Sequence, residues 1–137
     1  MSSDMLSAEW LERAKELVNQ DPGFRKRGSI DVTLGIKVGA AAFLVTFAGF
    51  TCHTVQTVVG GEVRNASFLI EMTADQWERF IAGRRSGAGR TLVEIDTTDG
   101  IIKAQHPRKK LDFLRFHTSL QAFFDAGAGA APVARVA

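Results

Sequence analysis

Residues 65–84 read NASFLIEMTADQWERFIAGR, and this stretch contains a strand and a helix in direct succession. Ala66–Met72 is a short apolar run, which is typical of a largely buried strand. Thr73 follows as a hydroxyl N-cap, and Gln76 stands three residues later, which is the pattern of a capping box. A helix is therefore predicted over Ala74–Ala82. Its apolar face carries Trp77, Phe80 and Ile81.

The sequence before this stretch predicts a β-meander. From Ile30 to Val38, apolar residues alternate with polar or small residues, and this period of two indicates a strand. Turn signals at Gly39-Ala40 and Gly49-Phe50 separate this run from two further runs. The last of them is Cys52–Val59. The middle run places on one face Phe43, Val45 and Phe47.

Part of this meander has roughly the length of a membrane-spanning helix, because residues 38–61 include no charged side chain. The segment is rich in threonine and glycine and also contains His53 and Gln56. A helix in a bilayer disfavours that polar density, whereas β-branched residues favour strands. Two strands are therefore predicted here.

Two more helices are predicted near the ends of the chain. Ser7 is an N-cap for a helix over Ser7–Asn19, which stops at the sequence Asn-Gln-Asp-Pro-Gly. Pro107 suits the first turn of a second helix over Arg108–Asp125. This last helix has an unusually wide apolar stripe, so it is expected to cover much of the core.

The pattern is weaker between the middle helix and the last one. Gly83 is predicted to end the middle helix, and residues 84–90 are predicted to form a flexible basic loop. Thr91–Ile95 fits either a short helix or a strand. Asp99-Gly100 is a turn signal, and Ile101–Gln105 is predicted to be the last strand.

The order of elements predicts one α+β domain in which helices cover a sheet, and 137 residues suffice for one such core. Residues 1–6 are expected to be a flexible N-terminus and residues 7–125 the folded domain. Residues 126–137 are rich in alanine and glycine and are expected to be a disordered tail.

Composition argues against several classes of function. The net charge of +2 gives no concentrated basic footprint, so no nucleic-acid partner is expected. The single cysteine, Cys52, allows no internal disulfide and suits a reducing, cytoplasmic setting. His53, His106 and His117 have no partners at metal-ligand spacing, so neither a metal site nor a cofactor is expected.

The stretch 65–84 and the segment Gly100-Ile-Ile-Lys-Ala before the last helix resemble the sterol carrier protein type-two family, over Trp10 to Phe124. This resemblance implies a mainly antiparallel five-stranded sheet covered by helices, with an apolar tunnel between the layers. It also implies carriage of a sterol, fatty acid or acyl-CoA without catalysis. The chain departs from the family at the basic segment 83–90, which replaces a polar helix.

Aromatic residues supply the candidate site, since the chain has ten Phe, two Trp and no Tyr. The last helix carries more rings than one sheet needs, so its rings are either plain core or the lining of a lipid cavity. His117 interrupts that face, as a half-exposed histidine or as a polar anchor at a cavity mouth. The candidate ligand-binding residues are Phe43, Phe47, Trp77, Phe80, Phe113, Phe116, His117, Leu120 and Phe124.

Three alternatives stay open at this point. The basic clusters at residues 25–27, 84–85 and 108–110 are either solvated surface or a transient contact with an anionic membrane. The chain could be a small α+β-cone enzyme acting on an apolar substrate, with an acid–base pair drawn from His53, Asp96, Asp99 and His117. It could also be a homodimer whose Phe-rich faces pack on each other.

Overall fold

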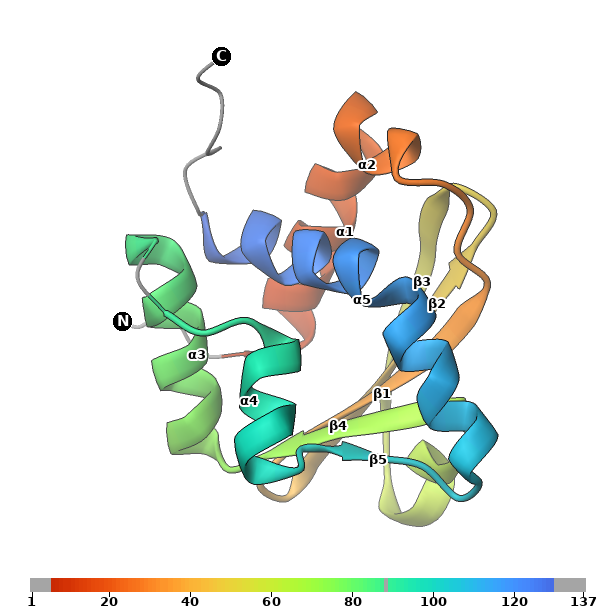
Figure 1. Ribbon diagram of the computed structural model, residues 1–137, viewed down its shortest axis with the longest axis vertical. Coiled ribbons are helices and arrows are strands. Elements are labelled where there is room, and N and C mark those ends of the chain that lie inside the picture. The colour runs from red at the N-terminus through yellow and green to blue at the C-terminus, as the bar shows by residue number, and fades with distance from the viewer. Residues whose placement is uncertain (1–5, 88, 130–137) are drawn as a thin grey trace.

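The structure is a computed structural model that describes residues 6–87 and 89–129. Five α-helices, five strands and one 3₁₀-helix make up the described part of the chain (Figure 1). The helices are α1 (Ala8–Asn19), α2 (Pro22–Lys26), α3 (Ala74–Ser86), α4 (Leu92–Asp99) and α5 (Pro107–Ala128). The strands are β1 (Val32–Val38), β2 (Ala41–Ala48), β3 (Thr51–Val58), β4 (Phe68–Met72) and β5 (Ile102–Lys103), with the 3₁₀-helix η1 (Gly60–Asn65) before β4.

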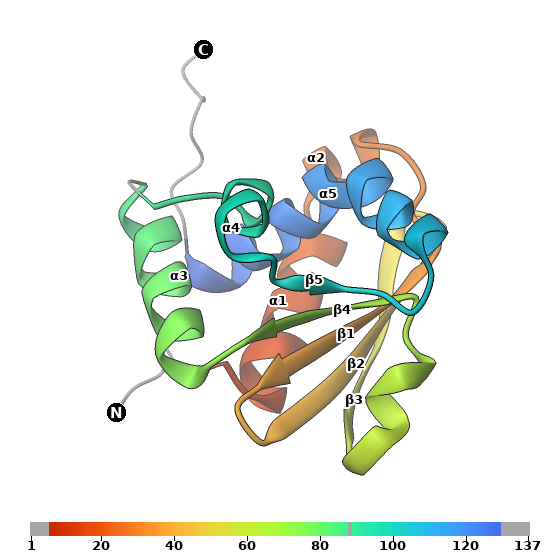
Figure 2. The same cartoon turned by 60° about the horizontal axis from the view of Figure 1, so that its bottom comes forward.

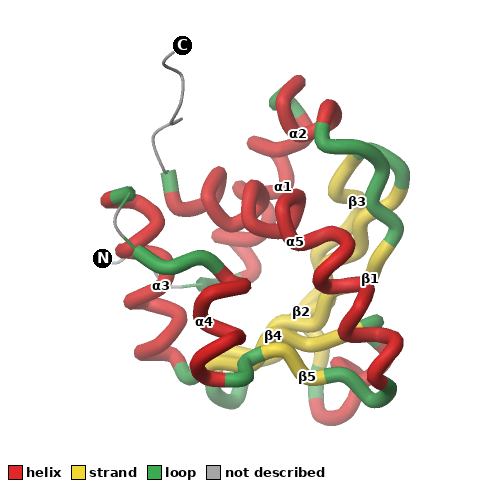
Figure 3. The backbone as a smooth tube through the Cα atoms, viewed as in Figure 1, coloured by secondary structure: helices red, strands yellow, loops and turns green. Residues whose placement is uncertain are grey.

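The five strands form one sheet in the order β3-β2-β1-β4-β5 (Figure 3). Strands β1, β2 and β3 are the predicted antiparallel meander. Strand β4 runs parallel to β1 because the chain crosses the sheet through η1 before it returns, and β5 pairs antiparallel with β4. The predicted α+β class and mainly antiparallel five-stranded sheet are therefore confirmed, with one parallel pair.

The two faces of the sheet are covered very unequally (Figure 2). The α-helices lie over the face to which the alternating residues of β1 and β2 contribute Leu34, Ile36, Phe43, Val45 and Phe47. On the opposite face, η1 packs Val63 against Ala42 and Leu44 in a second, smaller apolar cluster. Nearly all of the large buried side chains are therefore on the helix side.

Helix ends account for most of the differences from the sequence prediction. Thr73 and Gln76 form the expected capping box, with Gln76 N donating to Thr73 Oγ1 at 3.1 Å and Thr73 N donating to Gln76 Oε1 at 2.8 Å. The prediction that Gly83 ends α3 was wrong, because the helix continues to Ser86. The ambiguous segment Thr91–Ile95 is helical and belongs to α4, with Thr91 as its N-cap.

The folded part is also longer than predicted at both ends. Helix α5 extends beyond Asp125 to Ala128, and both Gly127 and Ala128 are buried. Leu6 is buried in the main core, so it does not belong to a flexible N-terminus. The remaining residues of the expected flexible ends, 1–5 and 130–137, lie outside the described residues.

Segment 38–61 contains the two strands β2 and β3, as predicted, and ends in the first residues of η1. In the described part of the chain, every helix is too short or too polar to cross a bilayer.

Candidate functional site

Aromatic rings from both layers meet in one cluster between the helices and the sheet. Phe124 of α5 lies at its centre. The Phe124 ring centroid is 5.5 Å from that of Trp77, 5.8 Å from Phe80, 5.3 Å from Phe123 and 6.1 Å from Trp10. Phe123 continues the cluster to the sheet, with its centroid 5.3 Å from that of Phe47. This cluster joins α1, α3 and α5 to β2.

The two indole N–H groups of the cluster have different surroundings. Trp77 Nε1 donates a 2.7 Å hydrogen bond to the backbone oxygen of Lys37, which fixes the ring against β1. Trp10 Nε1 is buried and finds no acceptor among the described residues. A buried donor without a partner is costly, at about 1–3 kcal/mol. Within the described residues, the Trp10 N–H is therefore an unsatisfied donor inside the aromatic cluster.

A cleft of about 310 Å³ opens between α3 and α4, beside this cluster. Its apolar wall is formed by Met72, Phe80 and Ile95, and these three side chains are almost fully buried. Phe80 contacts both Trp77 and Phe124, so it separates the cleft from the aromatic cluster.

The mouth of the cleft is charged. Arg79, Arg90, Asp99 and the capping residue Gln76 line it. Arg90 Nη2 lies 3.8 Å from Asp99 Oδ2, whereas none of the ion pairs in the described part of the chain involves Arg79. An apolar wall below a mouth with two arginines and one carboxylate suits an apolar ligand with a carboxylate or phosphate end.

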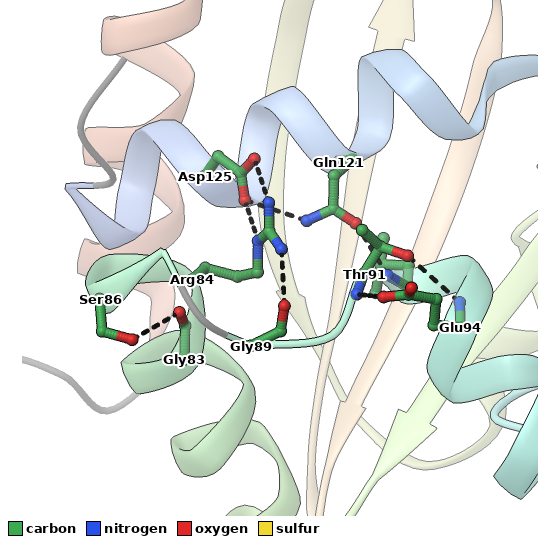
Figure 4. A network of polar contacts seen from close by, with 9 residues as sticks. Gly83, Arg84, Ser86, Gly89, Thr91, Glu94, Gln121 and Asp125 are labelled. Carbon is green, nitrogen blue, oxygen red and sulfur yellow. Dashed lines mark hydrogen bonds and ion pairs between the residues drawn. The ribbon is translucent and has the colours of Figure 1, made fainter. Parts of the chain in front are cut away.

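The loop between α3 and α4 forms one wall of the cleft, and a polar network holds it in place (Figure 4). Arg84 makes a two-pronged ion pair with Asp125 of α5, with Nε–Oδ1 at 2.7 Å and Nη2–Oδ2 at 3.1 Å. Arg84 Nη1 also donates to the backbone oxygen of Gly89 at 3.1 Å. The hydrogen bond to Asp125 raises the pKa of Arg84 further above its already high value.

Gln121 of α5 extends this network to α4. Its amide donates to Asp125 Oδ1 at 3.0 Å, and its oxygen accepts from Leu92 N at 2.8 Å. The loop also packs tightly on α3, since a Cβ at Gly89 would lie 2.7 Å from the Gly83 Cα. Gly83 therefore allows this close approach inside the helix and does not end it. The prediction of a flexible basic loop at 84–90 was wrong for the part that the structure describes.

The variant Arg84→Met is expected to loosen the loop that forms the wall of the cleft. It removes three hydrogen bonds and leaves the half-buried Asp125 with Gln121 alone. Because both partners are partly solvated, we expect a loss of about 1.5 kcal/mol of unfolding free energy rather than the full value of a buried pair. The free energy of local opening, measured by hydrogen exchange at Gly89 N and Leu92 N, should fall by a similar amount, so both amides should exchange faster. Arg79→Met, an exposed change on the same helix, is the control and should leave both amides unchanged.

The structure brings only part of the predicted site together. Phe47, Trp77, Phe80 and Phe124 belong to the aromatic cluster, and Leu120 is buried in the same core. Phe113 lies in a separate ring pair with Phe68, with centroids 5.7 Å apart, and His117 lies 6.4 Å from Phe113. Phe43 is buried in the core, but none of the ring contacts in the described residues joins it to the cluster.

Phe116 packs at the edge of the main core rather than in the aromatic cluster. Its ring is half-buried, and the guanidinium carbon of Arg115 lies 5.3 Å from the ring centroid. His117 lines a shallow surface hollow with Thr91, Val93 and Gln121. The predicted lining set is thus divided among the aromatic cluster, the rest of the core and its edge, and the surface hollow at His117.

Sequence reasoning missed four residues of this region. Trp10 and Phe123 fall within the predicted helices Ser7–Asn19 and Arg108–Asp125 but were given no role, and Met72 was placed at the end of a strand. Ile95 was missed because the class of its segment was open. A period of 3.6 residues identifies a buried face, but it does not say which buried residue borders a cleft.

The polar candidates for other chemistry do not assemble. Cys52 is buried, and burial raises the pKa of its thiol to about 12, so it stays protonated and is a poor nucleophile. Asp96 accepts from Ile102 N at 2.9 Å and pairs with Lys110 at 2.9 Å, so it fixes the start of β5. In residues 6–87 and 89–129, no group of His, Cys, Asp and Glu side chains has a geometry that could hold a metal ion.

The acid–base alternative needs two of four residues in contact. His53 is exposed on β3, Asp96 and Asp99 lie on α4, and His117 lies on α5. None of the hydrogen bonds and ion pairs found in the described part of the chain joins any two of them. The geometry thus gives no support to a general acid–base pair.

Comparison with known proteins gives a likeness in structure alone. No family model matches the chain, and no curated protein matches it in sequence. The crystal structure of sterol carrier protein 2 superimposes with a TM-score of 0.70 at 15% identity, covering 91% of this chain and 98% of the other. A conserved hypothetical protein from Thermus thermophilus that has been suggested to be a sterol carrier protein gives 0.63 at 16% identity, covering 96% and 95%.

Proposed function

We propose that this protein, which has the fold of sterol carrier protein 2, binds and carries one apolar lipid without catalysis. The observation that carries the proposal is the cleft between α3 and α4, because its apolar wall ends at the aromatic cluster. The lipid chain would lie against Met72, Phe80 and Ile95 and extend toward Trp77 and Phe124. The ligand class is a fatty acid, a sterol or an acyl-CoA.

Binding under this proposal requires the core to open. The rings of the cluster are almost fully buried and in mutual contact, so the lipid takes its space by moving Phe80 and, with it, α3 relative to α4. Each methylene that leaves water contributes about 0.8 kcal/mol, which offsets the cost of this opening for a long chain. The buried N–H of Trp10 supplies a donor for the polar group of a ligand that enters deeply.

The remaining parts of the proposal concern setting and partners. A protonated, buried Cys52 suits a reducing cytoplasm. The absence of contacts among the acid–base candidates of the described chain supports a carrier over an α+β-cone enzyme. A carrier also needs a membrane from which to take its lipid, so transient contact with a bilayer is part of the proposal. No observation favours the homodimer.

Titration with a fluorescent fatty acid tests the proposal directly. The parent protein should bind it with a micromolar dissociation constant, about −8 kcal/mol, and the emission of Trp77 should change on binding. Native mass spectrometry of protein purified from cells should show one lipid per chain. A parent protein that binds no fatty acid, sterol or acyl-CoA and carries no lipid would contradict the proposal.

Filling the cleft locates the ligand. Ile95→Trp places a larger ring in the cleft wall and should weaken fatty-acid binding about tenfold, since the methylenes nearest the mouth lose their contacts. Phe50→Trp, at the exposed β2–β3 turn, is the matched control and should bind as the parent does. Equal affinity in a folded Ile95→Trp variant would place the lipid elsewhere.

A further inference from the structure

The first half of α5 exposes two large apolar side chains on one face. Leu111 is 61% exposed and Leu114 is 47% exposed. They stand three residues apart, so they are neighbours on the helix surface, and they lie opposite the buried residues Phe113 and Leu120. The other large exposed apolar residues of the described chain, Leu17, Phe50 and Val59, lie singly on separate segments. We call Leu111 and Leu114 the leucine pair.

Cationic side chains surround the leucine pair. Between Pro107 and Thr118 the chain carries four cationic side chains and one acidic residue, Asp112. This local excess of positive charge is larger than the net charge of +2 of the whole chain. On the helical surface Arg108 and Arg115 lie to one side of the pair and Lys110 to the other. Arg108, Lys109 and Arg115 are exposed, and Lys110 is half-exposed while paired with Asp96.

The other two basic clusters do not have this arrangement. In the cluster at 84–85, Arg84 is bound to Asp125 and Arg85 donates to the backbone oxygen of Ala128. In the cluster at 25–27, Arg25 donates to the backbone oxygen of Asn19, and no exposed large apolar residue adjoins it on α2. Of the three basic clusters, only the one at the start of α5 places exposed cations beside a pair of exposed leucines in the part of the chain that the structure describes.

We propose that the leucine pair and its cations dock the protein on the surface of an anionic phospholipid bilayer. An apolar pair with cations on both sides matches the interface, where the leucines enter the acyl boundary and the cations contact the phosphate groups. Lys103, exposed on β5 immediately before this helix, adds to the same positive surface. The docked helix is the one whose second half carries Phe124.

The same features argue against two other occupants. A second copy of this chain would bring like charges together around the leucine pair, which opposes self-association through this face. A nucleic acid would satisfy the cations, but the two leucines would face phosphates and sugars without an aromatic ring for base stacking. A bilayer is the partner that satisfies both the charged and the apolar part.

The leucine pair and its cations lie on the surface of α5, and docking through them does not require the lipid cleft. Its residues are distinct from Met72, Phe80 and Ile95, which line the cleft. The two proposals can therefore fail separately: the Ile95→Trp variant should still bind vesicles, and variants of the leucine pair should still bind fatty acid.

Vesicle flotation of the full chain tests the docking proposal. The parent should float with phosphatidylcholine vesicles that contain phosphatidylserine and should stay unbound with phosphatidylcholine alone. Arg108→Ala combined with Arg115→Ala should lower the partition coefficient about 25-fold, since each cation contributes about fivefold near an anionic surface. Leu111→Ser combined with Leu114→Ser should lower it about tenfold, because apolar burial is lost. Both changes are at the surface, and circular dichroism should show an unchanged fold.

Matched controls remove equal charge and equal apolar area elsewhere. Arg25→Ala with Lys26→Ala, and Phe50→Ser with Val59→Ser, should bind vesicles as the parent does. The proposal would be overturned if the control variants lost as much vesicle binding as the α5 variants. It would also be overturned if the parent did not bind anionic vesicles. Duplex DNA is then added as a competitor for the vesicles. If DNA displaces the protein, and if the Leu111→Ser, Leu114→Ser variant binds both DNA and vesicles as well as the parent does, the surface recognises polyanions in general and the proposal is wrong.

Discussion

Phe124→Ala is expected to lower the free energy of unfolding by about 4 kcal/mol. The Phe124 ring is fully buried and contacts four other rings, which come from α1, α3 and α5 itself. Removing it eliminates these contacts and leaves a cavity that the surrounding helices fill only in part. Chemical denaturation should show a lower midpoint with a similar slope, because the surface exposed on unfolding hardly changes.

The same truncation at an exposed position separates burial from residue type. Phe50 is 51% exposed at the turn between β2 and β3, and Phe50→Ala should cost less than about 0.5 kcal/mol. The Phe124→Ala variant also tests whether Phe124 is only a core residue or lines a lipid cavity. If Phe124 lines the path of a lipid, the Phe124→Ala variant should bind a fatty acid more tightly than the parent does, although the variant is less stable. An unchanged stability would show that Phe124 is not part of a packed core.

Gly127→Val is expected to cost about 3 kcal/mol, because the residue lies against the end of the Trp10 ring. A Cβ at Gly127 would stand 2.5 Å from Trp10 Cη2 and 2.7 Å from Cζ2. The ring has little room to move, since Trp10 is 1% exposed and packs on Phe124. The variant therefore forces α1 and α5 apart. Thermal unfolding should show a midpoint several degrees lower, at about 2–4 °C per kcal/mol for a chain of this size.

A double-mutant cycle identifies the cause of that loss. In a Trp10→Leu background the overlapping ring atoms are absent, so adding Gly127→Val should then cost less than about 1 kcal/mol. The coupling free energy between the two sites should equal the difference between the cost of Gly127→Val in the parent and its cost in the Trp10→Leu background. Additive losses would mean that Gly127→Val acts through the helix backbone alone and would refute the steric explanation.

The strands and their buried faces were predictable because each carries its own pattern. The alternation over Ile30–Val38 gave β1 and its inward residues, and Thr73 with Gln76 gave the start of α3. Pairing was harder to predict. The parallel contact of β4 with β1 depends on where η1 crosses the sheet, and no local pattern in either strand specifies it.

Helix ends and the site were less predictable, because both depend on contacts between distant segments. Gly83 resembles a helix terminus in sequence, yet Gly89 packs against it and the helix continues. Phe113 and Phe124 share one stripe of α5, but they lie in different ring groups because the helix passes over different elements along its length. Sequence periodicity predicts which face is buried, and it does not divide that face into core and cleft.

The last residue of α1 has a consequence for how the sheet ends. The Asn19 amide donates to the backbone oxygen of Cys52 at 2.9 Å and accepts from its backbone N–H at 2.8 Å. These are the two bonds that a neighbouring strand would offer to that residue, so one side chain substitutes for a sixth strand at this corner. An incoming strand, from another molecule or from a misfolded chain, finds the first pairing position of the β3 edge already occupied. The edge of a sheet is where aggregation by strand addition begins, and here a single asparagine shields one end of it.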